Sequence, residues 1–371
     1  MLSNDQLYVL SCLRSSLRED AAPDDTIAIS ELSVIDTILR NGILLTVYNH
    51  LSPSIKEELK LKYNMAMKQS ITQDYEGKLI VRRMREEGIT CIGLKGWELR
   101  DLYPEFTMRQ MSDIDLLLAP YNFSRVRAIM TDLGFSSGEK ESPSKNDTFR
   151  KNTVSVETHK RLTESPNPAI VAWEEGLLER ADGFQLSKED FYTHHMIHMH
   201  HDFGNGSLGL RRIADTWLLQ KVEMDKRAVS ATLAELGLSV FNDRMVQLSK
   251  ACLGDIPMDE KSEYLLEHAC KYGIFGTEKS YKTARVVARG EIGKGRLAAL
   301  KDAVLPPYNN MKVMYPELEK HPVLLPYYWS KRLIGKSHKL KKNVKKMDYS
   351  IVTEESYQEM QMFLYAGGYN A

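Results

Sequence analysis

The sequence predicts an α+β protein in which a small mixed sheet lies between two helical regions. Apolar residues recur every three or four positions before residue 87 and again after Pro168, as they do on the buried stripe of a helix. Between these regions the pattern changes to strand, helix, strand, helix, strand, with strands expected at residues 89–94, 113–118 and 152–162. Because the strands are confined to the middle of the chain, a doubly wound α/β sheet is disfavoured.

Both helical regions carry recognisable helix ends. A long helix is expected over residues 55–85, with Gly88 ending it. Further along, Ser187 and Asp190 form a capping box that opens another helix. The chain exceeds the usual size of one hydrophobic core. We therefore expect three parts: an N-terminal helical region (1–74), a mixed domain (75–167) and a C-terminal helical domain (168–371).

The composition describes a soluble globular protein without a charge bias. Hydrophobic residues make up 43% and charged residues 27% of the chain, and 50 Lys and Arg balance 50 Asp and Glu. A neutral chain creates no overall field for nucleic acid or an acidic membrane, so electrostatic recognition has to be local. A nucleic-acid partner is thus possible but not favoured, with the Lys-rich run 337–346 as a candidate surface for one.

The expected location is the cytoplasm. The four cysteines are scattered without paired spacing, which suits reduced thiols rather than a disulfide framework or a zinc site. The N-terminal segment lacks the basic start and the long apolar stretch of a signal peptide. No stretch is apolar for long enough to span a bilayer, so no membrane partner is expected.

Residues 94–118, LKGWELRDLYPEFTMRQMSDIDLLL, combine the basic and acidic side chains that phosphoryl or nucleotidyl transfer requires. In a strand, Asp113 and Asp115 would project on one face while Ile114 points into the core. Two carboxylates on one face can share a hard cation such as Mg²⁺, which leaves its other positions to water and substrate phosphate. Asp113 and Asp115 are therefore candidate metal ligands.

A phosphate-binding element is expected beside these carboxylates. Gly96 permits a tight exit from the first strand, and the amides that open the following helix would face an anion. Lys95 and Arg109 would add positive charge to it.

A third acid lies on the last expected strand. In NTVSVETHKRL, Val154 and Val156 share one face, and Glu157 and His159 share the other. Glu157 is a candidate ligand, although any polar strand face shows the same alternation. His159 either shapes the site or satisfies a backbone group.

In combination these motifs resemble a known family. LKG, LYP, R-x-x-SDIDLLL, a helix ending in LGF, VETHKRL, LRRIADTWLL and YPELEKHPVLLPYYWSKRL are similar to segments of the bacterial uncharacterised nucleotidyltransferase family. That family is a branch of the DNA polymerase β-type nucleotidyltransferase superfamily, and the resemblance covers most of the chain. It implies a minimal nucleotidyltransferase sheet, with residues 75–167 as the catalytic domain and helical additions on both sides.

The resemblance also implies roles for single residues. The catalytic, metal-binding carboxylates would be Asp113, Asp115 and Glu157, the last standing where relatives usually carry aspartate. The groups that hold phosphate would be Lys95, Gly96, Arg109 and Ser112. With Mg²⁺ (or Mn²⁺) as cofactor, a nucleoside triphosphate would pass its monophosphate to a hydroxyl and release pyrophosphate. Trp97 stands where a small residue is more usual, and it either restricts the nucleotide or fills a local gap.

Three functions stay open at this point. The first transfers the nucleotide to a small molecule or sugar. The second, toxin-like, modifies a macromolecule such as tRNA or a protein side chain. The third is a nucleotide-binding or helical interaction module without turnover. Intact carboxylates argue against the third, and the neutral net charge argues mildly against nucleic acid.

The histidines after Ser187 form a separate feature. They share a stripe with the spacing of a metal-binding helical face, but Asp202 is the one acid near them in sequence. We expect this stripe to pack over the nucleotidyltransferase cleft. Its members are His194, His198 and His201, with Arg211, Arg212 and Asp215 expected close by.

Overall fold

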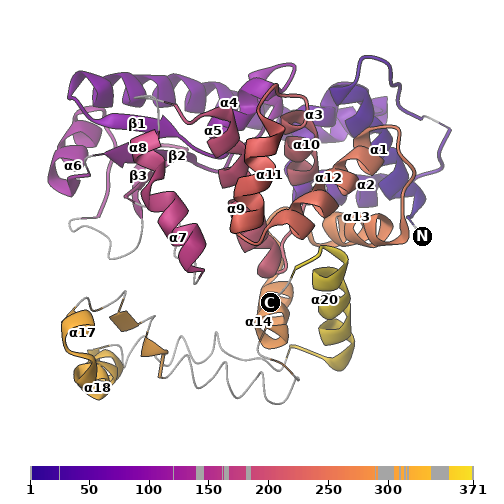
Figure 1. The fold of residues 1–371 in the computed structure, drawn as a ribbon. Helices are drawn as coiled ribbons and strands as arrows, with labels where there is room; N and C mark the ends of the chain where they lie inside the picture. Colours follow the sequence, from indigo (N-terminus) through magenta and orange to yellow (C-terminus); the bar gives the residue numbers. More distant parts are fainter. Residues whose placement is uncertain are drawn as a thin grey trace. The chain divides into compact units, whose positions relative to one another are not determined.

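The structure is a computed structural model (Figure 1). It describes residues 2–24, 26–119, 121–138, 146–160, 162, 167–180, 185–288, 290, 305–308, 311–312, 315, 317–335 and 351–369. The chain divides into two compact units. The larger unit holds Met1–Asp202, Leu208–Phe275 and Ala366–Tyr369, and the smaller holds Phe203–Ser207, Gly276–Tyr365 and Asn370–Ala371. Every candidate catalytic and phosphate-binding residue lies in the larger unit.

Four strands form one mixed sheet in the order β1-β2-β4-β3. β1 (Thr90–Gly93) runs antiparallel to β2 (Ile114–Ala119), and β2 runs parallel to β4 (Val154–His159). β3 (Asn146–Lys151) pairs antiparallel with β4 and forms the other edge. In the central parallel pair Asp115 lies opposite Glu157, so the register brings two acids from distant parts of the sequence together.

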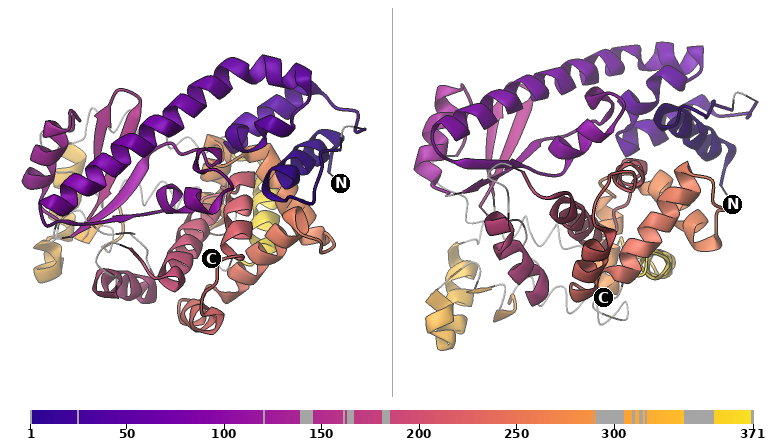
Figure 2. Two further views of the ribbon diagram at one scale, coloured as in Figure 1. Left: turned by 90° about the horizontal axis from the view of Figure 1, so that it is seen from above. Right: turned by 45° about the horizontal axis from the view of Figure 1, so that its top comes forward.

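Helices cover both faces of this sheet. α4 (Pro53–Glu86) and α6 (Phe123–Asp132) lie on one face (Figure 2), where α4 contributes Ile80 and Met84 to a core with the alternate side chains of the strands. On the opposite face Ile92 and Leu117 pack with Leu177 of α8 (Leu177–Arg180), which follows α7 (Pro168–Glu175). Successive strand residues alternate faces, so Asp115 and Glu157 share the α8 face.

The other helices precede, interrupt and follow the sheet in sequence. Before α4 come α1 (Asn4–Leu17), α2 (Glu31–Asn41), α3 (Leu44–Val47) and η1 (Tyr48–His50). Between β1 and β2 lie α5 (Gly96–Leu99), η2 (Arg100–Leu102) and η3 (Phe106–Met108). After α8 come α9 (Lys188–Gly204), α10 (Leu210–Leu219), α11 (Lys226–Glu235), α12 (Ser239–Leu253) and α13 (Glu260–Tyr272). The later helices are α14 (Glu278–Val287), α17 (Glu317–Lys320), η4 (Pro322–Leu324), α18 (Leu325–Gly335) and α20 (Glu354–Ala366).

The structure confirms the α+β class, the mixed sheet and the helical regions before and after it. Gly88, at a φ of +68°, follows the long helix α4, and the hydroxyl of Ser187 accepts a hydrogen bond from the backbone of Asp190 at the start of α9. One strand, β3, was not among the strands expected from the sequence. Phe149 is the one buried apolar side chain of β3, so the strand lacks the alternation that identifies the others.

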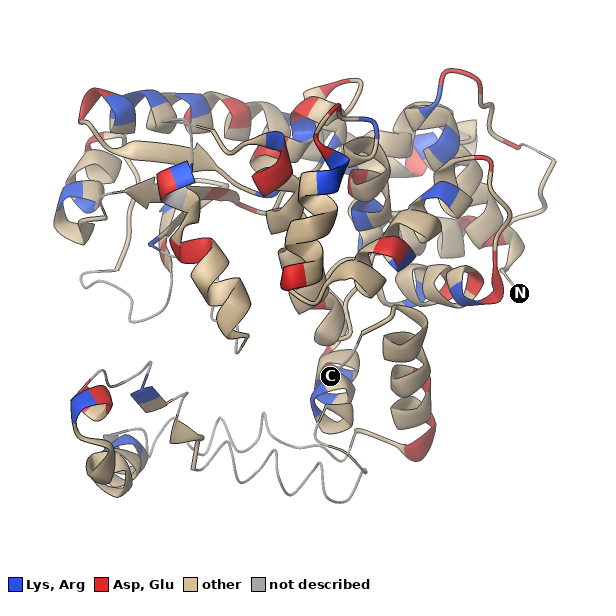
Figure 3. Cartoon of the chain, in the orientation of Figure 1, with Lys and Arg blue, Asp and Glu red and all other residues tan. Residues whose placement is uncertain are grey.

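Both signs of charge occur along the described chain. Basic and acidic residues are both present on α4, as Figure 3 shows. The Lys-rich run 337–346 lies outside the described residues. Among the helices that are described, none combines the length and the apolar character needed to cross a membrane.

Candidate active site

The turn after β1 holds Lys95 in a backbone conformation that side chains rarely adopt. Its φ of 49° and ψ of −120° favour glycine, and another residue held there costs about 1–3 kcal/mol. The turn brings the side chain to β2, where Nζ lies 2.6 Å from Oδ1 of Asp115. Backbone strain of this kind concentrates at functional sites, where the surrounding structure maintains it.

Gly96 leaves room for its neighbours in the same turn. A Cβ at this position would lie 2.4 Å from Nη1 of Arg109 and 2.9 Å from Cγ of Met111. A side chain therefore does not fit unless the loop before β2 moves. The role of Gly96 in holding phosphate stays a prediction.

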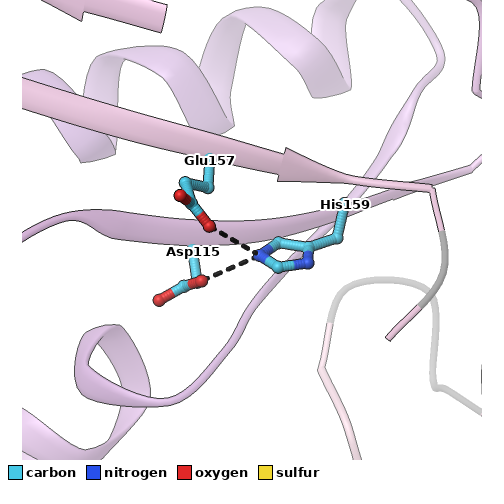
Figure 4. A group of neighbouring side chains, drawn as sticks. All are labelled: Asp115, Glu157 and His159. Carbon is cyan, nitrogen blue, oxygen red and sulfur yellow. Dashed lines mark hydrogen bonds and ion pairs between the residues drawn. The ribbon is translucent and has the colours of Figure 1, made fainter. Parts of the chain in front are cut away.

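Three ligand atoms converge where β2 and β4 pair. Nε2 of His159 lies 2.8 Å from Oδ1 of Asp115 and 3.8 Å from Oε2 of Glu157 (Figure 4). One ligand atom from each of the three residues lies within 4.8 Å of the others. In the described part of the chain this is the only such group of three or more His, Cys, Asp or Glu side chains.

Asp115 is held in its ionised form. Burial alone would raise the pKa of this carboxyl, but the hydrogen bond from His159 and the nearby Lys95 ammonium outweigh burial and lower the pKa to about 2. Glu157 has its own support, because the side-chain amide of Asn146 on β3 donates to Oε2. Both acids are thus fixed as acceptors on one face of the sheet.

Asp113 and Ser112 lie just before β2 rather than within it. The Ser112 hydroxyl donates to Oδ1 of Asp113 at 2.8 Å, and Asp113 is partly exposed. Asp113 is not one of the three converging residues, whose third member is His159. The metal-binding role of Asp113 and the phosphate-binding role of Ser112 stay predictions.

Arg109 is engaged in a buried ion pair. Its Nε and Nη2 donate to the two oxygens of Asp215 on α10, at 2.9 and 2.8 Å, and the Tyr103 hydroxyl donates to Oδ1 of the same carboxylate at 2.8 Å. Burial acts to raise the pKa of Asp215, and the charge of Arg109 outweighs it and lowers the pKa. The pair ties the loop before β2 to α10. A phosphate-binding role for Arg109 stays a prediction.

Trp97 fills space against α4 and β1. A Cβ on Gly77 would lie 2.0 Å from its ring, and a Cβ on Gly93 would lie 2.3 Å from it, so both glycines are needed to seat the indole. The guanidinium of Arg100 stacks on the ring with its carbon 3.6 Å from the centroid. Trp97 is 8% exposed and belongs to the core on the α4 face, opposite to Asp115.

The histidine stripe of α9 divides into buried and exposed members. His194 is buried, and within the described residues neither of its ring nitrogens has a hydrogen-bond partner. Burial, then the charges of Lys95 and His159, lower its pKa to about 3. The ring of His198 lies 6.4 Å from that of His194, and its Nδ1 lies 3.4 Å from Nη1 of Arg212. His201 is exposed.

One partner at this site escaped sequence reasoning, and another was left undecided. Asn146 supports Glu157 from β3, the strand that the sequence missed. His159 was left with two explanations, and the structure directs its Nε2 at two carboxylates. The available signal was position, because His159 follows Glu157 by two residues on the same strand face.

The segment that carries this site also matches a protein-family model. The model of the uncharacterised nucleotidyltransferase family matches residues 29–254, which is more than half of the chain and includes the sheet, Lys95, Asp115, Glu157, His159 and Asp215. No curated protein and no solved structure matches the chain. The chain therefore belongs to the uncharacterised nucleotidyltransferase family.

Proposed function

We propose that this chain is a metal-dependent nucleotidyltransferase. It transfers a nucleoside monophosphate from a nucleoside triphosphate to a hydroxyl acceptor, a small molecule or sugar, and releases pyrophosphate. The observation that carries the proposal is the convergence of Asp115, Glu157 and His159 beside Lys95, inside the segment that matches the family model.

The donor set fits a divalent cation, because carboxylates are the oxygen ligands that Mg²⁺ and Mn²⁺ accept. Asp115 and Glu157 would hold the ion, with Asp113 as a further ligand at the start of β2. When bound, the ion neutralises the charge of the reacting phosphate. Asp115 stays ionised to bind it, because its pKa is lowered to about 2.

The chain's basic groups would position the triphosphate. The flexible Lys95 side chain is 24% exposed, so its ammonium can turn from Asp115 to a phosphate oxygen. Ser112 and the backbone of Gly96 would contribute hydrogen bonds. Arg109 would act on this arrangement through Asp215, by fixing the loop that leads into β2. In-line attack requires such positioning more than covalent participation by the protein.

We also propose a cytoplasmic location. None of the four cysteines forms a disulfide and all four are buried, which fits a reducing compartment. Burial raises the pKa of the Cys91 thiol on β1 to about 12, so this thiol is protonated and unreactive.

The test is incubation of the full chain with each labelled nucleoside triphosphate, Mg²⁺ or Mn²⁺, and small-molecule cell extract. We expect metal-dependent pyrophosphate release and a labelled small molecule. Label on added tRNA or protein instead would identify the toxin-like alternative. Nucleotide binding without pyrophosphate release under any condition would identify a non-catalytic module and overturn the proposal.

A further inference from the structure

We propose that the metal ion of this site is held by one nitrogen and two oxygens, Nε2 of His159 with Asp115 and Glu157, and that the site selects Mn²⁺ over Mg²⁺. The inference deepens the proposed function, on which it rests for the reaction but not for the binding of the metal. It also departs from the ligand set that the sequence suggested, which contained three carboxylates and no nitrogen.

The separations between the ligand atoms fit a common ion. Two neighbouring ligands of an octahedral ion, each at about 2.1–2.2 Å, lie roughly 3 Å from each other. Nε2 of His159 lies 2.8 Å from the Asp115 oxygen and 3.8 Å from the Glu157 oxygen. The Glu157 side chain is 28% exposed, so it has room to rotate toward the ion, at the cost of the hydrogen bond that its Oε2 accepts from Asn146.

His159 is aimed at the carboxylates by its place in the sheet. The ring is 1% exposed, it belongs to the strand that pairs in parallel with β2, and Figure 4 shows its Nε2 facing both acids. Among the described residues Nδ1 has no hydrogen-bond partner. Metal binding through Nε2 requires the proton to lie on Nδ1, so the ion has to offset an unpaired buried N–H as well as the lost hydrogen bond from Nε2 to Asp115.

An imidazole ligand discriminates between the two candidate metals. Mg²⁺ is a hard ion that takes oxygen ligands and retains its waters, whereas the first-row transition metals accept imidazole together with carboxylates. Mn²⁺ keeps an octahedral shell, so these three ligands leave three positions for Asp113, water and phosphate oxygens. Zn²⁺ in its usual tetrahedral shell would leave a single position. The donor set therefore favours Mn²⁺ for a reaction that must also bind a triphosphate.

The Lys95 ammonium competes with the ion for Asp115. Its ammonium contacts the same Asp115 oxygen as His159 does, at 2.6 Å. Like charges on one carboxylate oxygen repel, so the metal and Lys95 alternate at this position. Binding of the ion thus releases the ammonium toward the phosphates, which links metal binding to nucleotide binding.

The test is pulsed electron paramagnetic resonance of the full-length protein loaded with Mn²⁺ and no nucleotide. We expect a nitrogen hyperfine coupling to the metal, which changes when histidine is labelled with the heavy nitrogen isotope. The coupling should vanish in His159→Gln, with Mn²⁺ affinity reduced about tenfold or more. It should persist in His201→Gln, which removes an exposed histidine of α9.

Isothermal titration of the wild-type chain completes the test, and it needs no variant to fold. We expect Mn²⁺ to bind at least about tenfold more tightly than Mg²⁺. A nitrogen coupling that is absent from wild type, or that survives in His159→Gln, overturns the inference, and so do equal affinities for the two ions. If pyrophosphate release persists in that case, the proposed function stands and only the ligand assignment fails.

Discussion

The larger unit contains two groups of charged side chains, around Asp215 and around Asp115. They differ in how fully the charged groups are paired with one another and shielded from solvent. Around Asp215, Arg109 and Tyr103 supply three hydrogen bonds, and all three side chains are less than a tenth exposed. Around Asp115, Lys95 and His159 share a single oxygen, and the Lys95 and Glu157 side chains are 24% and 28% exposed.

This difference separates a structural ion pair from a binding site. Both aspartates have a lowered pKa, so a lowered pKa alone does not identify the functional residue. A satisfied buried pair has little capacity for a further partner, and breaking it leaves a charge without compensation. A group that keeps solvent access can exchange a protein partner for a ligand. We therefore expect changes at Asp115 to affect activity and changes at Asp215 to affect stability.

The largest expected effect is on catalysis by Asp115→Asn. The amide cannot replace a metal-binding carboxylate, so pyrophosphate release should fall by about 10²–10³-fold or more. The fold should persist, because Lys95 is free to turn its ammonium to solvent. Steady-state rates, with a thermal melt of each protein, measure this. Asp101→Asn is the matched control, since that aspartate side chain is 72% exposed. A variant with the wild-type rate would remove Asp115 from the active site.

Asp215→Ala should act on stability instead. It leaves the Arg109 guanidinium buried without its carboxylate, which typically costs about 3–5 kcal/mol of the free energy of unfolding. Urea denaturation measures the loss. Asp36→Ala, which breaks the exposed pair with Arg40 on α2, should cost much less. If Asp215→Ala instead melts like wild type and only weakens nucleotide binding, Arg109 belongs to the phosphate site and the comparison fails.

Buried histidines should make the larger unit sensitive to mild acid. Burial is the main cause that lowers the pKa of His194 to about 3 and that of His195 to about 4, so both stay neutral in the folded chain. The unfolded chain binds their protons near pH 6.5. Below that value the unfolded state holds more protons, and each histidine should remove about 1.4 kcal/mol of stability per pH unit until its folded pKa is reached.

Urea denaturation between pH 7 and pH 5 measures this slope. His194→Gln should flatten it by the share of one histidine, whereas His201→Gln, at an exposed position, should leave it unchanged. An unaltered slope in His194→Gln would show that this ring is protonated or solvated in the folded chain.

The sequence was sufficient for the parts of the fold that depend on local pattern. The strands β1, β2 and β4 carry apolar runs or alternation, and α4 ends at a glycine that requires a positive φ. β3 was not predictable in this way, because Phe149 is the one apolar side chain that it buries. β3 is a strand because its backbone pairs with β4, and its own residues show no strand pattern.

The sequence suggested members of the candidate site only where a local pattern marks them. Asp115 and Lys95 lie in one continuous motif, and Glu157 follows from strand alternation. The partner of Arg109 is Asp215, which comes from a helix more than a hundred positions away, and no local pattern selects that carboxylate over others. Alternation places His159 on the face of Glu157, but only the parallel register with β2 brings its ring to Asp115.

The smallest expected effect separates the charge of Lys95 from the strain of its backbone. Lys95→Ala and Lys95→Gly both remove the ammonium, but only glycine adopts a φ of 49° and a ψ of −120° without strain. The glycine variant should therefore be more stable than the alanine variant by about 1–3 kcal/mol in urea denaturation. Both should lose activity to a similar extent, because the side chain rather than the backbone acts on phosphate. Equal stabilities would mean that the turn relaxes at no cost, and an active glycine variant would show that the Lys95 ammonium does not act on the phosphates.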